Sequence, residues 1–383
     1  MTTARQWWRR AAAAAKDRRS LCLTRVAPAT TRSGAELEAA VIRATSHDER
    51  SVDARGAARV FALARASPGT TLRPLMWALA RRAGRTRCWA VALKSLMLAH
   101  GLLLRSDELA PGAAARLGRV PFDLADFRAR SSGSPGLSAF VRAYFCFLDT
   151  RSLFAAQELD AEADDEDARL DRLWKRQHLL ELLMQIRPYG DGMEKQSLVL
   201  EAMDCVVIEI FEVYSQVCTG IARFLVAVLG SAPTAPRPRR GEDLAAARRR
   251  RGAQGMRVLR KAAEQSKQLS AYFELCRGLG VLNAAEFPAV ERVPDDDIRD
   301  LEKLIMSHHA EDGCKVGDDE AKALVAVEED DSGVASKTVV TREWVVFDDG
   351  DVDGAGARGR QGHFGDYVDP FVGAPWVSVN LLV

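Results

Sequence analysis

The sequence has no uninterrupted apolar run of about 18 residues, the length that a helix needs to span a bilayer. It also has no G-x-S-x-G nucleophile elbow, no phosphate-binding P-loop and no Cys/His spacing typical of a zinc site. We therefore expect no membrane-spanning helix, no enzyme activity, no metal and no cofactor.

Cysteine pairs are missing as well, although the chain contains seven cysteines. They are scattered, with no Cys-x-x-Cys spacing, and most fall within apolar helical stretches. This pattern predicts buried free thiols and a reducing compartment.

Two short motifs near the C-terminus imitate ligand sites. Residues 349–354 spell D-x-D-x-D-G, the start of an EF-hand loop, but Arg360 stands at the twelfth position, where a bidentate Glu is required. Residues 354–359 spell G-x-G-x-x-G, without the βαβ setting of a nucleotide site. We expect neither motif to bind a ligand.

Charge is distributed unevenly along the chain, although the net charge is only +1. Residues 1–100 contain 19 Lys and Arg against 6 Asp and Glu, whereas residues 307–383 contain 6 against 16. A basic N-terminal part indicates an anionic partner, and both nucleic acid and an anionic membrane fit this description.

Helical periodicity dominates the first 300 or so residues and predicts an all-α fold. A helical hairpin is expected over Leu37 to Arg65. Its first helix buries Leu37, Val41 and Ala44, and its second starts near Asp53, whose carboxylate suits a helix N-terminus. Arginines then remain at the connecting end of the hairpin, where phosphates bind readily.

The stretch Cys88–Leu104 is apolar almost all round, so we expect a buried helix behind the hairpin. Its exceptions are Lys94 and His100, and a lone His in such a helix is more often a hydrogen-bonded core residue than a ligand. Later helices are expected over Leu137–Phe154, Leu170–Ile186, Ser197–Leu229 and Glu242–Leu279. Helix pairs of this kind predict a solenoid of stacked antiparallel helices.

Several stretches resemble the ANTH domain of plant clathrin assembly proteins, in the ANTH/ENTH family. They are, in family order, AVIRATSHDE (40–49), RPLMWAL (73–79), RTRCWAVALKSLMLAHGLL (85–103), GRVPFDLADF (118–127), FVRAYFCFLD (140–149) and AYFELCRGLGVLNAAEFPAVERVP (271–294). Together they run over roughly residues 1–306, and this order is far more specific than any single motif.

The resemblance implies an ANTH-type superhelical solenoid over residues 1–306. Within it we expect an N-terminal helix and linker (1–33), a phosphoinositide-binding part (34–158) and a long-helix part (159–306). Residues 307–383 are acidic and Gly-rich with small apolar islands, and we expect a disordered tail there.

In function, the resemblance implies an endocytic adaptor that binds phosphatidylinositol 4,5-bisphosphate and promotes clathrin coat assembly. The implied partners are the clathrin heavy chain, adaptor-complex appendage domains and vesicle SNAREs. The implied location is the cytoplasmic face of the plasma membrane and of the Golgi and trans-Golgi network, in clathrin-coated pits and vesicles.

The family's lipid motif is a Lys, nine residues, a second Lys, one residue, Lys or Arg, and then His or Tyr. This chain places Arg43, Asp53, Arg55 and Gly56 at those four positions, so two of them keep a basic residue. We predict phosphoinositide binding by Arg43 and Arg55, with Arg50 and Arg59 substituting because they lie near the same end of the hairpin. Weakened or altered lipid selectivity is an open alternative.

The expected tail contains Asp369, Pro370 and Phe371, which resemble the DPF motif that binds adaptor appendage domains. A short turn would present Phe371 to an apolar pocket, with Asp369 fixing its orientation.

Two alternatives stay open from the residues alone. Residues 1–20 are rich in Arg and Ala, which suits a transit peptide, a helix packed on the domain, or a helix at a membrane surface. The rival to the adaptor is a nucleic-acid-binding helical scaffold that uses two basic clusters, Arg81, Arg82, Arg85 and Arg87 in the first and Arg248–Arg251 in the second.

Overall fold

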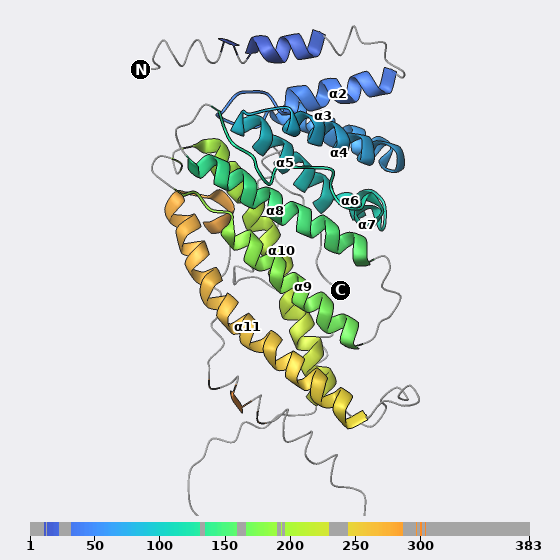
Figure 1. The fold of residues 1–383 in the computed structure, drawn as a ribbon, viewed down its shortest axis with the longest axis vertical. Coiled ribbons are helices and arrows are strands. Elements are labelled where there is room, and N and C mark those ends of the chain that lie inside the picture. Colours follow the sequence, from blue (N-terminus) through green and yellow to red (C-terminus); the bar gives the residue numbers. More distant parts are fainter. Residues whose placement is uncertain are drawn as a thin grey trace, which may run out of the picture.

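The computed structural model describes an all-helical chain (Figure 1). The description covers residues 11–12, 14–22, 32–130, 135–158, 166–189, 193, 196–229, 244–285, 296, 299–300 and 303. No strand occurs within these residues, which confirms the predicted all-α class. The motifs over residues 349–360 and the sequence Asp369–Phe371 lie outside the described residues.

The helices have the following bounds: α2 Arg32–Ala44, α3 Ala54–Ala66, α4 Pro68–Gly84, α5 Trp89–Leu104, α6 Ser106–Leu109, α7 Ala113–Leu117, α8 Pro135–Glu158, α9 Glu166–Gln185, α10 Ser197–Leu229, α11 Leu244–Leu279 and a final 3₁₀ turn Leu282–Ala285. Residues 14–22 are helical too. Figure 1 shows the short helices α2 to α5 gathered at one end and the long helices α9 to α11 running to the other.

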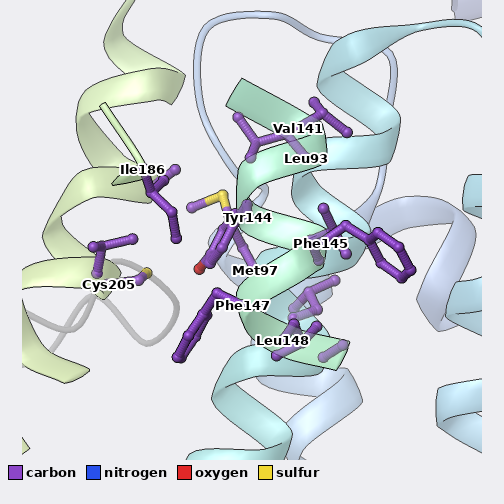
Figure 2. Packing of buried hydrophobic residues seen from close by; sticks show 14 of the residues in the cluster. Leu93, Met97, Val141, Tyr144, Phe145, Phe147, Leu148, Ile186 and Cys205 are labelled. Atoms are coloured by element: carbon purple, nitrogen blue, oxygen red, sulfur yellow. The ribbon is translucent and has the colours of Figure 1, made fainter. Parts of the chain in front are cut away.

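Helix α5 forms the centre of the core, as its apolar circumference predicts. Almost all of its residues are buried, including Lys94 and His100. It packs against α4 on one side and against α8 and α10 on the other. Figure 2 shows Leu93 and Met97 of α5 among the aromatic side chains of α8, with Ile186 and Cys205 closing the same cluster. The hairpin and the adjoining parts of the long helices therefore share one continuous core, and two smaller clusters, around Met256 and around Val258, lie further along these helices.

His100 is a hydrogen-bonded core residue, as predicted. Its Nδ1 lies 2.8 Å from the hydroxyl of Tyr144, and its Nε2 lies 3.2 Å from a carboxylate oxygen of Glu209. Arg151 pairs with the other oxygen of Glu209 at 2.5 Å. Burial alone would raise the pKa of Glu209, but Arg151 and His100 outweigh that effect and lower it to about 2. This charged network joins α5, α8 and α10 inside the core.

The expectation of buried thiols is wrong for most of the described cysteines. All six are free, but only Cys205 and Cys276 are buried, while Cys22, Cys146 and Cys218 are exposed. Apolar neighbours in the sequence did not reveal burial because a helix turns 100° per residue, so adjacent residues face different ways.

Candidate phosphoinositide site at the α2–α3 connection

The connecting loop, residues 45–53, begins where α2 ends and finishes at a capped helix. Thr45 donates both its N–H and its hydroxyl to the carbonyl of Val41, at 2.9 and 2.6 Å, and so closes the last turn of α2. Asp53 is the N-cap of α3, and its carboxylate accepts the N–H of Arg55 at 3.2 Å. The buried stripe of Leu37, Val41 and Ala44 is confirmed.

Lys94 of α5 holds the middle of the connecting loop from beneath. Its ammonium donates to the carbonyl of Asp48 at 2.6 Å and lies 3.3 Å from both the carbonyl and the hydroxyl oxygen of Ser46. Burial lowers the pKa of Lys94, whereas the carboxylates of Asp48 and Glu201 act in the opposite direction. A buried cation needs such partners, so these oxygens tie the loop backbone to the core helix.

Helix α10 holds the second half of the connecting loop. The N–H of Val52 donates to Glu201 at 3.0 Å, and the hydroxyl of Ser197 donates to the carbonyl of Arg50. Burial raises the pKa of Glu201, although the hydrogen bond from the N–H of Val52 opposes the effect. Two helices that are far apart in the sequence thus fix the path of one loop.

Arg82 and Asp17 hold the first half of the connecting loop. Arg82 of α4 donates to the hydroxyl and the carbonyl oxygen of Thr45, at 2.9 and 3.0 Å, and pairs with Asp17 at 2.7 Å. Asp17 also accepts the N–H of His47 at 2.9 Å and contacts its ring nitrogen at 2.7 Å. Burial would raise the pKa of Asp17, yet the hydrogen bonds from His47 and Arg82 lower it. The helical residues 14–22 therefore pack on this end of the domain.

Three of the four predicted arginines lie at the connecting end of the hairpin. Arg43 is exposed in the last turn of α2, and Arg55 is exposed in the first turn of α3. Neither has a carboxylate within ion-pair distance among the described residues. Arg50 lies in the connecting loop, 3.6 Å from Asp48, and both of these side chains are well exposed.

Arg59 is placed differently from the other three arginines. It lies one turn further into α3, and its guanidinium pairs with Glu36 near the start of α2. This cross-helix ion pair directs the side chain away from the connecting loop. The structure therefore brings Arg43, Arg50 and Arg55 to one end and leaves Arg59 outside that group.

Sequence reasoning missed the residues that support the loop, namely Lys94, Glu201, Ser197 and Asp17. Lys94 carried a signal, since a charge on an otherwise apolar helix must find a buried partner. No sequence pattern pointed to Glu201 or Ser197, because they lie about 150 residues along the chain from the loop residues that they contact.

Among the described residues, no helix combines the length and the apolar character needed to cross a membrane. The same residues contain no cluster of three or more His, Cys, Asp or Glu side chains that could hold a metal ion.

Comparison with known families decides the membership of the chain. The family model described as the ANTH domain matches residues 36–235 and 242–307. The chain belongs to the ANTH domain family. Two Arabidopsis thaliana proteins, each named "putative clathrin assembly protein", are 38% and 36% identical to it, and each match covers 89% of this chain and 87% or 88% of the relative. The Arabidopsis clathrin coat assembly protein AP180 is 24% identical over 78% of this chain and 49% of its own length.

The structure gives a physical reason for each departure from the ANTH lipid motif. Asp53 stands where the motif has a Lys, and it caps α3. Gly56 stands where the motif has His or Tyr, at a close approach of α3 to the backbone of α2. A Cβ on Gly56 would lie 2.7 Å from the backbone nitrogen of Ala44 and 2.9 Å from its Cα.

We therefore expect Gly56→Ala to destabilise the ANTH domain by about 1–3 kcal/mol, because backbone atoms must move to admit the methyl group. Urea denaturation measures this change. Gly69→Ala in α4 is the matched control: its Cβ meets no atom within 4 Å, so it should be neutral or stabilising by up to about 1 kcal/mol. Equal stability of Gly56→Ala and the wild type would contradict the close approach of α2 and α3.

Proposed function

We propose that this protein is a peripheral adaptor of clathrin coats whose helical head binds membranes containing phosphatidylinositol 4,5-bisphosphate. Membership of the ANTH domain family and the names of the Arabidopsis relatives support a role in clathrin assembly. In this proposal residues 1–306 form the head, with the lipid-binding part over 34–158 and the long-helix part over 159–306. Residues 307–383 form the tail.

The observation that carries the lipid half of the proposal is the fixed connecting loop with exposed arginines around it. Arg43, Arg50 and Arg55 surround the N-terminus of α3, where the helix dipole also favours an anion. Near an anionic leaflet, each of them contributes about 1 kcal/mol, or roughly 3 kcal/mol in total. Asp53 opposes them, so we expect weak binding and rapid exchange on the membrane.

Because the head alone binds weakly, stable recruitment requires further contacts, and linked weak sites gain through effective concentration. We propose the clathrin heavy chain and an adaptor appendage domain as these contacts, and vesicle SNAREs as cargo. The corresponding location is the cytoplasmic face of coated pits and vesicles at the plasma membrane and the Golgi and trans-Golgi network.

Two observations weigh against the rival nucleic-acid scaffold. Arg81 pairs with Glu38 at 2.6 Å and Arg82 with Asp17 at 2.7 Å, so half of the first basic cluster is already occupied. The second cluster begins α11, which starts at the opposite end of the molecule from α4 (Figure 1). One continuous basic surface for a nucleic acid backbone is therefore not formed by these two clusters.

Replacement of Arg43 and Arg55 by Glu tests the lipid site. We expect the double variant to lose vesicle binding about tenfold or more, since each reversal removes roughly 1 kcal/mol of attraction and adds repulsion. Sedimentation of the full chain with phosphatidylcholine vesicles containing phosphatidylinositol 4,5-bisphosphate measures the loss. Its helicity should equal that of the wild type because both side chains are exposed.

The matched control is Arg250→Glu with Arg257→Glu, which makes the same charge change on exposed residues of α11. This control should bind as the wild type does. If the two double variants lose binding equally, net charge and not the connecting loop governs attachment. If duplex DNA or RNA displaces the vesicles, the rival scaffold is favoured.

The tail half of the proposal rests on Asp369, Pro370 and Phe371, which lie outside the described residues. Phe371→Ala should abolish capture of the full chain by an immobilised adaptor appendage domain, because it removes the side chain that fills the apolar pocket. Phe364→Ala is the control, since it removes a nearby Phe that is not part of the DPF sequence. Undiminished capture of Phe371→Ala would mean that DPF is a chance tripeptide.

A further inference from the structure

The outward face of α4 carries an aromatic residue between two arginines. Arg73, Trp77 and Arg81 recur at every fourth position, so they are neighbours along one face of the helix. All three are exposed, and Trp77 retains 57% of its full accessibility. The buried residues of α4 lie on the opposite side of the helix. We call these three residues the Trp77 ridge.

The charges around the Trp77 ridge suit an anionic surface. In the described part of the chain, the carboxylate that pairs with the ridge is Glu38 of α2, which lies 2.6 Å from Arg81. Arg73 has no carboxylate within ion-pair distance among those residues. The remaining positive charge lies beside an indole, whose apolar ring and polar N–H favour the headgroup region of a bilayer.

The shape of the Trp77 ridge favours a bilayer over a peptide. Its residues project from a single helix, so they form a convex surface. A bound peptide helix or strand needs a groove or a sheet edge, whereas a fluid headgroup layer adapts to a convex surface.

The Trp77 ridge also lies close to the connecting loop. Arg82, next to Arg81 in the sequence, donates hydrogen bonds to Thr45 at the start of that loop. Five residues separate Arg82 from Trp77, which corresponds to about 8 Å along a helix axis. Trp77 therefore lies less than two helical turns from the residue that holds the start of the connecting loop.

We propose that the Trp77 ridge is a second membrane contact, in which Trp77 enters the headgroup layer of an anionic bilayer while Arg73, which has no ion-pair partner among the described residues, meets a lipid phosphate. The head then lies tilted, with α4 turned toward the bilayer, and the connecting loop and the ridge contact the membrane together. This inference rests on the proposed membrane role of the head. It adds a contact that needs anionic lipid but no particular phosphoinositide.

The test compares Trp77→Ala with Trp174→Ala in the full chain. Trp174 of α9 is the matched control because it is another exposed Trp, at 49%, in the long-helix part of the molecule. Neither substitution changes the charge, so electrostatic attraction is held constant. Binding is measured by sedimentation with phosphatidylcholine vesicles, alone or with phosphatidylserine, and with phosphatidylinositol 4,5-bisphosphate at matched charge.

We expect Trp77→Ala to weaken binding to the phosphatidylserine vesicles about fivefold, since an indole at the interface gains roughly half the transfer free energy of a fully buried side chain. Trp174→Ala should bind as the wild type does, and Trp77→Phe should recover part of the loss. Circular dichroism should show equal helicity for all variants.

Three outcomes overturn the inference while leaving the proposed lipid site intact. They are equal binding by Trp77→Ala and the wild type, equal losses in both Ala variants, and tighter binding by Trp77→Ala. The last result would mean that another part of the chain, such as the acidic residues 307–383, covers the ridge. If the wild type binds no anionic vesicle at all, this inference and the proposed function both fail.

Discussion

The hydrogen bonds from the Lys94 ammonium to the loop carbonyls are the interaction on which the candidate site depends. A cation on the central core helix is costly unless oxygen atoms surround it. Here the backbone of Ser46 and Asp48 supplies these atoms. Lys94 needs these carbonyls because its ammonium is buried. The carbonyls need Lys94 because they point toward the core helix, where they require a hydrogen-bond donor. Arginines on either side of that loop are therefore held at defined positions.

The same principle, buried polar groups that bind across helices, recurs through the fold. Glu209 joins α5, α8 and α10 through His100 and Arg151, and Asp204 of α10 accepts the N–H of Asn283 at 2.9 Å. Burial raises the pKa of Asp204 to about 6, although that hydrogen bond opposes the effect. A shifted register of these helices would leave the charges buried without partners, which is costly.

The sequence was sufficient for features that depend on local periodicity. The stripe of Leu37, Val41 and Ala44, the helix start at Asp53 and the buried Cys88–Leu104 stretch each follow from spacing and capping chemistry, and each is confirmed. The order of the ANTH-like stretches also predicted the family correctly.

Features that depend on contacts between distant segments could not be predicted. In the sequence, Gly56 only removes a hydrogen-bond donor from the motif. In the structure it has a steric role, because a side chain there would meet the backbone of Ala44. The sequence suggests that Arg59 substitutes in the site because it lies near the same end of the hairpin, but in the structure its guanidinium pairs with Glu36 of the neighbouring helix. The exposure of Cys146 and Cys218 depends on which way their helices face, which apolar neighbours in the sequence do not specify.

Hydrogen exchange of the full chain on vesicles tests the central claim most directly, namely that the fixed connecting loop contacts the phosphoinositide. Exchange is compared between vesicles with phosphatidylinositol 4,5-bisphosphate and vesicles of equal charge made with phosphatidylserine. The account predicts slower exchange over residues 43–56 on the phosphoinositide vesicles and a smaller change there on the phosphatidylserine vesicles. Unchanged exchange over residues 43–56 on phosphoinositide vesicles that bind the protein would contradict it, since the lipid would then contact another surface.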